Sequence, residues 1–277
     1  MTSASSHRER PDGAGREEVV RWITGPSGRL HVRERSGGGR AIVLVHGLGN
    51  HLGVWDDVLS RLPTDLHVVR LDLHGAGESE PSPTGDYRVE AAAADLWAVV
   101  DALAIARVAL VGHSYGGAVI GAACGMHPDR VDGALFVDPA VDTPHYEKVE
   151  AMRQGVEPAN FEVFVNAWYT MMLQNAVPVV RARVLDMLWA TPRDMFASTT
   201  RGLVDYDPKP ALRRFTGLKL SLVGPTNSVI PQSIHCCDVG VEAVEMTGCS
   251  HWMMMDRPDE FVGHLEAFMA RLQAPPP

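Results

Sequence analysis

Residues 108–120 read VALVGHSYGGAVI. The apolar run 108–111 is typical of a buried strand, and it continues directly into GHSYG and a glycine- and alanine-rich segment that favours a helix. GHSYG (112–116) fits the pattern Gly-x-Ser-x-Gly, in which a sharp strand-to-helix turn strains the serine backbone and points the hydroxyl outward. A glycine-rich turn without chemistry would be the alternative. The preceding strand, the following helix and a downstream histidine instead favour Ser114 as a nucleophile.

Segments with strand and helix character alternate on both sides of this motif. The predicted strands cover residues 19–23, 30–34, 41–45, 67–71, 108–111, 133–137, 218–223 and 242–246. Besides the helix that follows Ser114, the predicted helices cover residues 55–62, 88–104 and 258–272. Regular alternation implies parallel strands that are covered by helices on both faces. The sequence therefore predicts an α/β fold with a doubly wound, mostly parallel, eight-stranded sheet.

The alternation stops between residues 141 and 207, where the sequence is helical in character and rich in methionine and aromatic residues. We expect this segment to form a helical lid over the strand ends, inserted into a core of residues 19–140 and 208–273. Most of its apolar side chains should pack between helices, because methionine and aromatic residues commonly fill cores. A minority can line a substrate pocket, for which the candidates are His113, Trp168, Met172, Trp189 and Trp252.

The composition limits the class of protein. The 277-residue chain is 45% hydrophobic and 21% charged, which suits one globular core with a buried sheet. Its formal net charge of −9 disfavours nucleic acid as a partner, because phosphate-binding surfaces rely on clustered Lys and Arg. No apolar run approaches the roughly 20 residues that a membrane-spanning helix needs, so we expect no membrane partner.

The cysteines and the chain ends bear on the cellular compartment. The four cysteines show neither Cys-x-x-Cys spacing nor the density of a small secreted scaffold, which favours reduced thiols in the cytoplasm. Residues 1–18 are polar and lack the apolar core of a secretion signal. We expect them to form a disordered tail, residues 274–277 to be frayed, and the protein to be cytoplasmic. The oligomeric state stays open.

Several further motifs stand in an order that resembles the α/β-hydrolase superfamily, and the resemblance covers nearly all of residues 19–272. HGLGN (46–50), after the third strand, is similar to the superfamily's His-Gly loop. The resemblance implies that the backbone N–H groups of Leu48 and Tyr115 form an oxyanion hole. Fixed donors and the helix dipole suit a developing negative charge there. The side chain of His46 is expected to be structural.

Two more motifs extend the resemblance. DLHGAGES (72–79), after the fourth strand, is similar to the superfamily's Asp-x-x-Gly-x-Gly-x-Ser loop, which we interpret as architectural. GCSHW (248–252), after the last strand, is similar to the loop that delivers the catalytic histidine. Histidine suits this role because its ordinary pKa, about 6.5, lets it take and return a proton near neutral pH. His251 is therefore the candidate base.

The third member of the triad departs from the superfamily's pattern. GPTNSVIP (224–231) resembles the Gly-x-x-Asp-x-x-x-Pro segment that follows the penultimate strand, but Asn227 stands where the orienting aspartate is expected. An amide carries no charge with which to stabilise an imidazolium. In a serine protease, the change from aspartate to asparagine lowers turnover by about 10⁴.

Three explanations compete. In the first, the acid has moved to Asp138 in FVDPA (136–140), as in some lipases and lactonases of the superfamily, whose spacing from the serine resembles the 138 − 114 = 24 residues here. In the second, Asn227 is a natural or engineered attenuation. In the third, the pocket binds a ligand without turnover. We favour the first, although an aspartate at this position also suits a turn or cap. Asp142 and Asp238 have no pattern behind them.

The sequence predicts a serine hydrolase that needs no cofactor and no metal. No His-x-x-x-His pair or carboxylate cluster has metal-ligand spacing, and no glycine-rich phosphate loop carries a lysine. The composition of the lid favours a carboxylic ester or lactone of a medium-sized apolar small molecule, cleaved through an acyl-enzyme. One alternative is a carbon–carbon hydrolase of the meta-cleavage type, suggested by the pair His251-Trp252. The other is a ligand receptor with an incomplete triad, suggested by Asn227.

Overall fold

The computed structural model describes residues 17–273. The tails predicted at residues 1–18 and 274–277 lie outside this range, apart from the last two residues of the first tail. Glu18 is not part of a loose tail, because its Oε1 accepts a hydrogen bond from Nε of the buried Arg70 at 2.7 Å. The chain is therefore held to the sheet just before the first strand begins.

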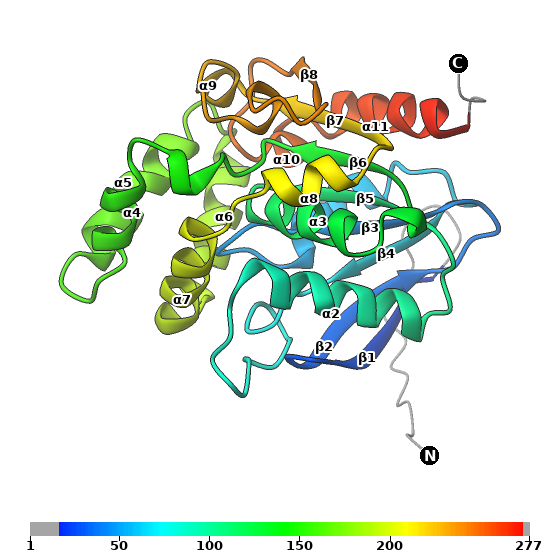
Figure 1. The fold of residues 1–277 in the computed structure, drawn as a ribbon, viewed down its shortest axis with the longest axis horizontal. Helices are drawn as coiled ribbons and strands as arrows, with labels where there is room; N and C mark the ends of the chain where they lie inside the picture. Colours follow the sequence, from blue (N-terminus) through cyan, green and yellow to red (C-terminus); the bar gives the residue numbers. More distant parts are fainter. Residues whose placement is uncertain (1–16, 274–277) are drawn as a thin grey trace.

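Within the described residues, eight strands form one sheet (Figure 1). The strands are β1 (Val19–Gly25), β2 (Gly28–Arg35), β3 (Ala41–Val45), β4 (His67–Leu71), β5 (Val108–His113), β6 (Val131–Val137), β7 (Leu218–Val223) and β8 (Glu242–Glu245). Their order across the sheet is β1-β2-β4-β3-β5-β6-β7-β8. β2 is antiparallel to both β1 and β4, and the remaining pairs are parallel. The prediction of a mostly parallel, eight-stranded sheet is confirmed.

The helices connect these strands. Within the described residues they are α1 (Asp56–Leu59), α2 (Val89–Ala102), α3 (Tyr115–Met126), α4 (Val149–Gly155), α5 (Phe161–Met172), α6 (Pro178–Ala190), α7 (Arg193–Val204), α8 (Lys209–Arg214), α9 (Pro225–Ser228), α10 (Met253–Asp256) and α11 (Pro258–Gln273). The long predicted helices at 88–104 and 258–272 agree with α2 and α11 to within two residues at each end.

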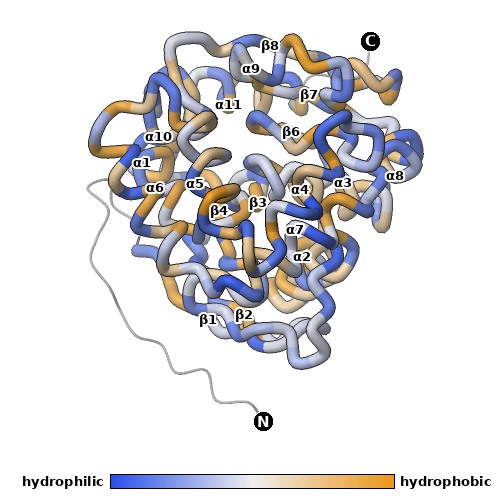
Figure 2. The backbone as a smooth tube through the Cα atoms, turned by 90° about the vertical axis from the view of Figure 1, so that its left-hand side faces the viewer, coloured by the Kyte–Doolittle hydropathy of each residue, from blue (hydrophilic) through white to orange (hydrophobic). Residues whose placement is uncertain are grey.

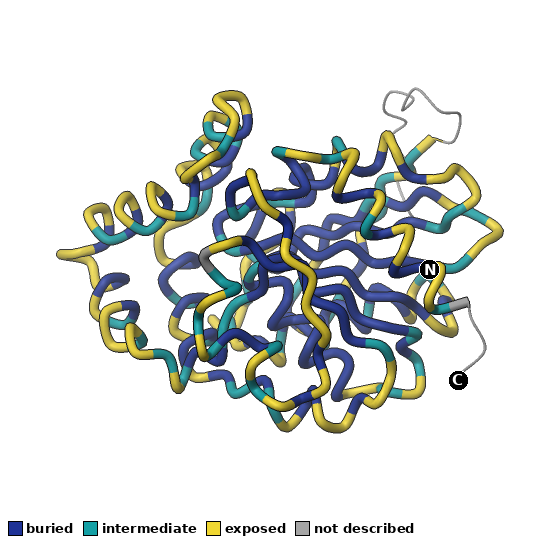
Figure 3. Tube along the Cα trace, turned by 90° about the horizontal axis from the view of Figure 1, so that it is seen from above, coloured by how far each residue is buried: buried dark blue, intermediate teal, exposed yellow. Residues whose placement is uncertain are grey.

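Helices cover both faces of the sheet, as predicted for a doubly wound fold. The central strand β3 shows why, since all five of its residues are buried and its side chains point alternately to the two faces. Ala41, Val43 and Val45 belong to the apolar core under α2, α3 and α8. Ile42 and Leu44 belong to the core under α1, α10 and α11. Figure 3 shows the buried strands in dark blue through the middle of the molecule.

The helix predicted at residues 55–62 is shorter than expected. A 3₁₀ turn, Leu52–Trp55, is followed by the single turn of α1, which ends at Leu59. The carbonyl of Leu59 would need the N–H of residue 63 to continue the helix, but Pro63 has none. The oxygen of Leu59 accepts instead from the N–H of Leu62 at 3.3 Å and from the guanidinium of the buried Arg35 at 3.0 Å.

Helices α4–α7 occupy the segment between β6 and β7 that the sequence predicts as a lid, and they lie at one end of the molecule (Figures 1 and 3). Hydrophobic (orange) and hydrophilic (blue) residues are mixed along these helices (Figure 2), and each helix buries only some of its residues. Their role as a lid stays a prediction. No helix in the described part of the chain combines the length and the hydropathy needed to cross a membrane.

Candidate active site

Ser114 lies at the turn between β5 and α3. Its backbone angles are φ 52° and ψ −116°, a conformation that residues with a side chain rarely adopt. Backbone hydrogen bonds hold the turn against β6: the N–H of Ser114 donates to the oxygen of Val137 at 3.0 Å, and its carbonyl accepts from the N–H of Ala140 at 3.1 Å. The strained turn predicted from the motif is present.

The glycines of the motif allow a close approach of backbones. A Cβ atom at Gly112 would lie 2.3 Å from the carbonyl oxygen of Gly116, and one at Gly116 would lie 2.5 Å from the oxygen of Val45. Both contacts would be with backbone atoms, which have little freedom to move. Helix α3 therefore reaches its position over β3 and β5 only because these residues lack side chains.

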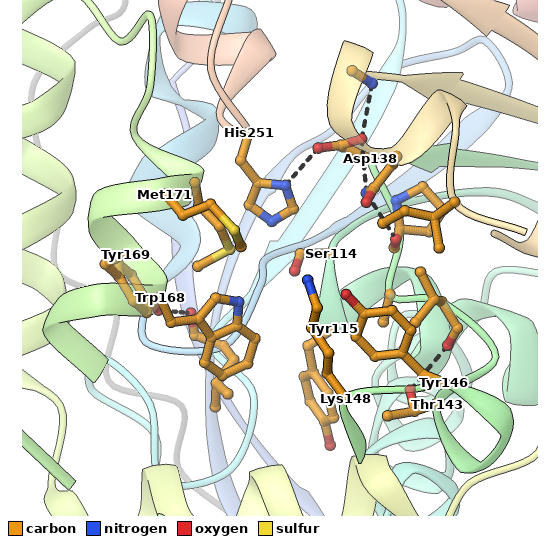
Figure 4. A pocket seen from close by; sticks show the side chains of 18 of the residues that line it. Ser114, Tyr115, Asp138, Thr143, Tyr146, Lys148, Trp168, Tyr169, Met171 and His251 are labelled. Atoms are coloured by element: carbon orange, nitrogen blue, oxygen red, sulfur yellow. Dashed lines mark hydrogen bonds and ion pairs between the residues drawn. The ribbon is translucent and has the colours of Figure 1, made fainter. Parts of the chain in front are cut away.

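His251 and Asp138 meet across the carboxyl ends of β6 and β8. Nδ1 of His251 lies 2.6 Å from Oδ2 of Asp138. Figure 4 shows the imidazole between this carboxylate and the hydroxyl of Ser114. The backbone of His251 is held on both sides, because its N–H donates to the oxygen of Met172 at 3.1 Å and its carbonyl accepts from Nε2 of His113 at 3.0 Å. The three predicted triad residues thus line one cavity.

Asn227 contacts the carboxylate of Asp138 and not the histidine. Its Nδ2 donates to Oδ1 of Asp138 at 2.9 Å, and the N–H of Gly224 donates to the same oxygen at 2.8 Å. The two oxygens of the carboxylate are therefore divided between the histidine and the loop that carries Asn227. Neither of the other carboxylates considered, Asp142 and Asp238, lines the cavity.

Leu48 and Tyr115, the predicted oxyanion residues, both line the cavity beside Ser114. Tyr115 is the first residue of α3, so its N–H has no acceptor within the helix. The loop of Leu48 is anchored by His46, whose Nε2 accepts from the N–H of Leu73 at 3.0 Å while Nδ1 lies 2.8 Å from the oxygen of Gly47. Burial lowers the pKa of His46 and favours the neutral ring that this pattern requires.

The loop that begins at Asp72 has structural contacts throughout, in agreement with its architectural interpretation. Oδ1 of Asp72 accepts a hydrogen bond from the N–H of Leu52 at 2.7 Å. Oδ2 of Asp72 contacts Nδ1 of His31 at 2.8 Å and accepts from the N–H of Glu78 at 3.0 Å. Burial opposes ionisation, but these hydrogen bonds, led by that of His31, outweigh it and lower the pKa of Asp72. An ionised Asp72 therefore ties the turn at Leu52, just after the His-Gly loop, to β2.

The cavity has a volume of about 690 Å³ and opens between the strand ends and α5. His113, Trp168, Met172 and Trp252 line it, as predicted. Trp189 does not line it, which corrects the prediction, and this side chain is 50% exposed on α6. The buried face of α6 consists of Val180, Val184, Met187 and Leu188. This spacing of i, i+4, i+7 and i+8 turns the residue at 189 away from the core.

Metal ligands do not gather anywhere in residues 17–273, since no group of three or more His, Cys, Asp or Glu side chains there has the geometry to hold an ion. All four cysteines lie in this range and carry free thiols.

A family model described as the alpha/beta hydrolase fold matches residues 40–199, more than half of the chain. The chain belongs to the α/β hydrolase fold family. It is 24% identical over 240 residues to 3-oxoadipate enol-lactonase 2 of Acinetobacter baylyi, in a match that covers 83% of this chain and 89% of that protein.

Solved structures share this α/β hydrolase fold. A thermophilic esterase from Thermogutta terrifontis superposes with a TM-score of 0.78 at 21% identity, covering 92% of this chain and 99% of the esterase. An enol-lactonase from Burkholderia xenovorans superposes with a TM-score of 0.76 at 24% identity, covering 90% of this chain and 99% of the lactonase. Because both sequence identities are below 25%, the two superpositions are evidence of a shared fold.

Three side chains at the site of this α/β hydrolase were not selected from the sequence. Tyr146 and Lys148 line the cavity after a short 3₁₀ turn (Thr143–His145) in which no motif is present. The chain contains three lysines, so a lysine inside the predicted lid was an available signal. The hydroxyl of Tyr169 on α5 donates to the oxygen of Leu48 at 2.7 Å, a contact between residues 121 positions apart that no local pattern predicts.

Proposed function

We propose that this chain is a serine hydrolase that cleaves a carboxylic ester or lactone of a medium-sized small molecule through an acyl-enzyme. The observation that carries the proposal is the 2.6 Å contact between His251 Nδ1 and Asp138 Oδ2 in the cavity that also contains Ser114. The names of its relatives, an enol-lactonase and esterases, support an ester or lactone as the bond that is cleaved.

In the proposed reaction, His251 carries each proton that is transferred. Nδ1 of His251 is engaged with Asp138, which leaves Nε2 to take the hydroxyl proton as Ser114 attacks the carbonyl carbon. The Asp138 carboxylate orients the ring and stabilises the imidazolium that forms. His251 then returns the proton to the leaving alcohol, which in a lactone stays attached to the acyl group. A water molecule, deprotonated by the same imidazole, releases the acid from Ser114.

The negative charge that develops on the carbonyl oxygen during the attack is stabilised best by hydrogen-bond donors that are already in position before the reaction. The N–H groups of Leu48 and Tyr115 are proposed to fill this role, because both residues lie beside Ser114 and the second opens helix α3. The apolar wall formed by Phe164, Trp168 and Met171 of α5 favours a substrate with a hydrocarbon portion.

The two alternatives have weaker support. The carbon–carbon hydrolase depends on the pair His251-Trp252, and the indole N–H of Trp252 donates to Oδ1 of Asn50 at 2.8 Å, which gives this tryptophan a structural role. The receptor was suggested by a missing acid at Asn227. The contact between Asp138 and His251 supplies an acid from another position and so favours the hydrolase.

The test is turnover of a panel of p-nitrophenyl esters, aliphatic lactones and aryl dienoate diketones by the parent chain, Ser114→Ala and the control Ser60→Ala. Ser60 is exposed in the turn that follows α1 and does not line the cavity. We expect ester or lactone turnover that falls at least about 10³-fold in Ser114→Ala and stays unchanged in Ser60→Ala. Turnover of the diketones alone would favour the carbon–carbon hydrolase, and equal activity of both variants would contradict a serine mechanism.

A further inference from the structure

The segment after Asp138 forms the wall of the cavity that faces α5, and it brings two polar side chains to Ser114. Tyr146 and Lys148 both line the cavity. Figure 4 shows the hydroxyl of Tyr146 and the ammonium of Lys148 pointing into the cavity, toward Ser114. Neither group has a part in the mechanism proposed above.

Lys148 differs from the other two lysines of the chain in its partners. Lys209 contacts Oδ2 of Asp142, and Lys219 donates to the carbonyl oxygens at the end of α8, at 3.0 Å for Leu212. Among the contacts made within residues 17–273, no hydrogen bond or ion pair engages the ammonium of Lys148. Lys148 is an exposed residue whose ammonium points into a largely apolar cavity, where no side chain of residues 17–273 pairs with it.

The negative groups near Lys148 do not supply its counter-charge. Asp138 lines the cavity, but its two oxygens are engaged with His251 and with the loop of Asn227. Glu147 also lines the cavity and is exposed to solvent. Within the described residues it makes no ion pair with Lys148. Water solvates the exposed ammonium of Lys148 in the free protein. A substrate that fills the cavity displaces part of this water, and a charge-assisted hydrogen bond to an anion on that substrate is then stronger than one in bulk water.

We propose that Lys148, with the hydroxyl of Tyr146, binds a carboxylate that the substrate carries near its scissile carbonyl. An ammonium offers three donors and a compact charge, and a phenol adds a fourth donor, which together suit the two oxygens of a carboxylate. The inference rests on the proposed function and narrows the substrate to a half-ester of a dicarboxylic acid, or a lactone that bears a carboxylate. The apolar wall of α5 would then contact the methylene groups between the two ends.

The first test compares monoethyl glutarate with ethyl pentanoate, which has the same number of acyl carbons and a methyl group in place of the carboxylate. Acid release in a pH-stat gives the ratio of the two kcat/KM values. We expect the ratio to fall about tenfold in Lys148→Met, equivalent to about 1.4 kcal/mol, and to recover in Lys148→Arg. Glu147→Gln should raise the ratio. Arg213→Met removes an exposed cation of α8 outside the cavity and should leave it unchanged.

The second test measures binding without turnover. Isothermal titration of succinate, glutarate and adipate into Ser114→Ala and into Ser114→Ala/Lys148→Met should show about tenfold weaker binding of at least one dicarboxylate to the double variant. Equal binding, or no binding to either protein, together with an unchanged kinetic ratio, overturns the anion site. Lysine-dependent binding in a chain whose ester turnover survives Ser114→Ala would support the anion site while contradicting the serine hydrolase, so the two proposals fail separately.

Discussion

The carboxylate of Asp138 explains why an amide suits position 227. Oδ2 faces the imidazole of His251, and Oδ1 accepts hydrogen bonds from Asn227 Nδ2 and the N–H of Gly224. Asparagine can donate to a carboxylate, whereas an ionised aspartate only accepts. An aspartate at 227 would set two negative charges about one hydrogen-bond length apart. The acid at 138 and the asparagine at 227 are therefore complementary.

Asn227→Asp should accordingly lower turnover, by about ten- to a hundredfold, and reduce the free energy of unfolding at neutral pH by about 1–3 kcal/mol. Asn227→Ala, which removes the donor without adding charge, should fall between this variant and the parent. Asp138→Asn should lose about 10⁴ in kcat, by analogy with the serine-protease aspartate. Ester kinetics on the three variants check the order. Higher turnover in Asn227→Asp would instead assign the acid to position 227.

At the scale of elements, helix α3 is set against β3 at a distance that only glycine permits. Gly116→Ala would bring a Cβ to 2.5 Å from the oxygen of Val45, so we expect it to lower the free energy of unfolding by about 2 kcal/mol or more. Gly121→Ala on the same helix is the matched control, because its Cβ would lie 3.6 Å from Leu212. It should raise stability by up to about 1 kcal/mol through helix propensity.

Urea unfolding of both alanine variants measures these differences. Equal stability of Gly116→Ala and Gly121→Ala would mean that α3 can move away from β3 without cost, and that the close approach does not fix the turn of Ser114.

Helix α5 touches both loops that carry the proposed chemistry. The hydroxyl of Tyr169 donates to the oxygen of Leu48 at 2.7 Å, and three residues later the oxygen of Met172 accepts from the N–H of His251 at 3.1 Å. Burial raises the pKa of Tyr169, which keeps the hydroxyl protonated as a donor. One helix of the segment between β6 and β7 thus contacts both the loop of Leu48 and the loop of His251.

Tyr169→Phe should therefore lower kcat about three- to tenfold, with a smaller effect on KM, and reduce the free energy of unfolding by about 1 kcal/mol. Tyr87→Phe is the matched control, because its hydroxyl accepts from the N–H of Ser82 at 3.3 Å outside the cavity. Steady-state kinetics measure kcat and KM for both variants. An unchanged kcat in Tyr169→Phe would show that the loop of Leu48 keeps its position without this hydrogen bond.

At the scale of the whole molecule, two buried histidines link stability to pH. Burial lowers the pKa of His46, and it lowers that of His113 further, with the nearby His251 adding to the effect. Unfolding returns both rings to their ordinary pKa of 6.5, so the unfolded chain binds more protons below that pH. Their contribution is fully present above about pH 6.5 and is lost as the pH falls toward the folded-state values.

The free energy of unfolding should hence fall below pH 6.5 by up to about 1.4 kcal/mol per pH unit for each histidine. His46→Gln should reduce this slope, whereas replacement of the exposed His127 by glutamine should not. Urea titrations between pH 5 and 7.5 measure both slopes. A slope in His46→Gln equal to that of the parent would contradict the assignment.

Much of this architecture could be predicted from the sequence, because buried strands and the Ser114 turn have local signatures. The features that could not be predicted depend on tertiary contacts. The end of α1 depends on Pro63 together with Arg35, which lies 24 residues before Leu59. The exposure of Trp189 depends on which face of α6 is turned to the core, since the neighbouring residue Leu188 belongs to the buried face. The direction of Lys148 depends on how a loop without a motif folds back over the cavity.

The nucleophile is the central claim, and it is tested most directly by labelling with diethyl p-nitrophenyl phosphate, an activated ester that serine hydrolases attack. The account predicts release of one equivalent of p-nitrophenol per chain, and mass spectrometry should find the diethylphosphoryl group on the peptide that contains Ser114. Labelling should be absent in Ser114→Ala and slow in Asp138→Asn. A label on another residue, or release that persists in Ser114→Ala, would contradict it.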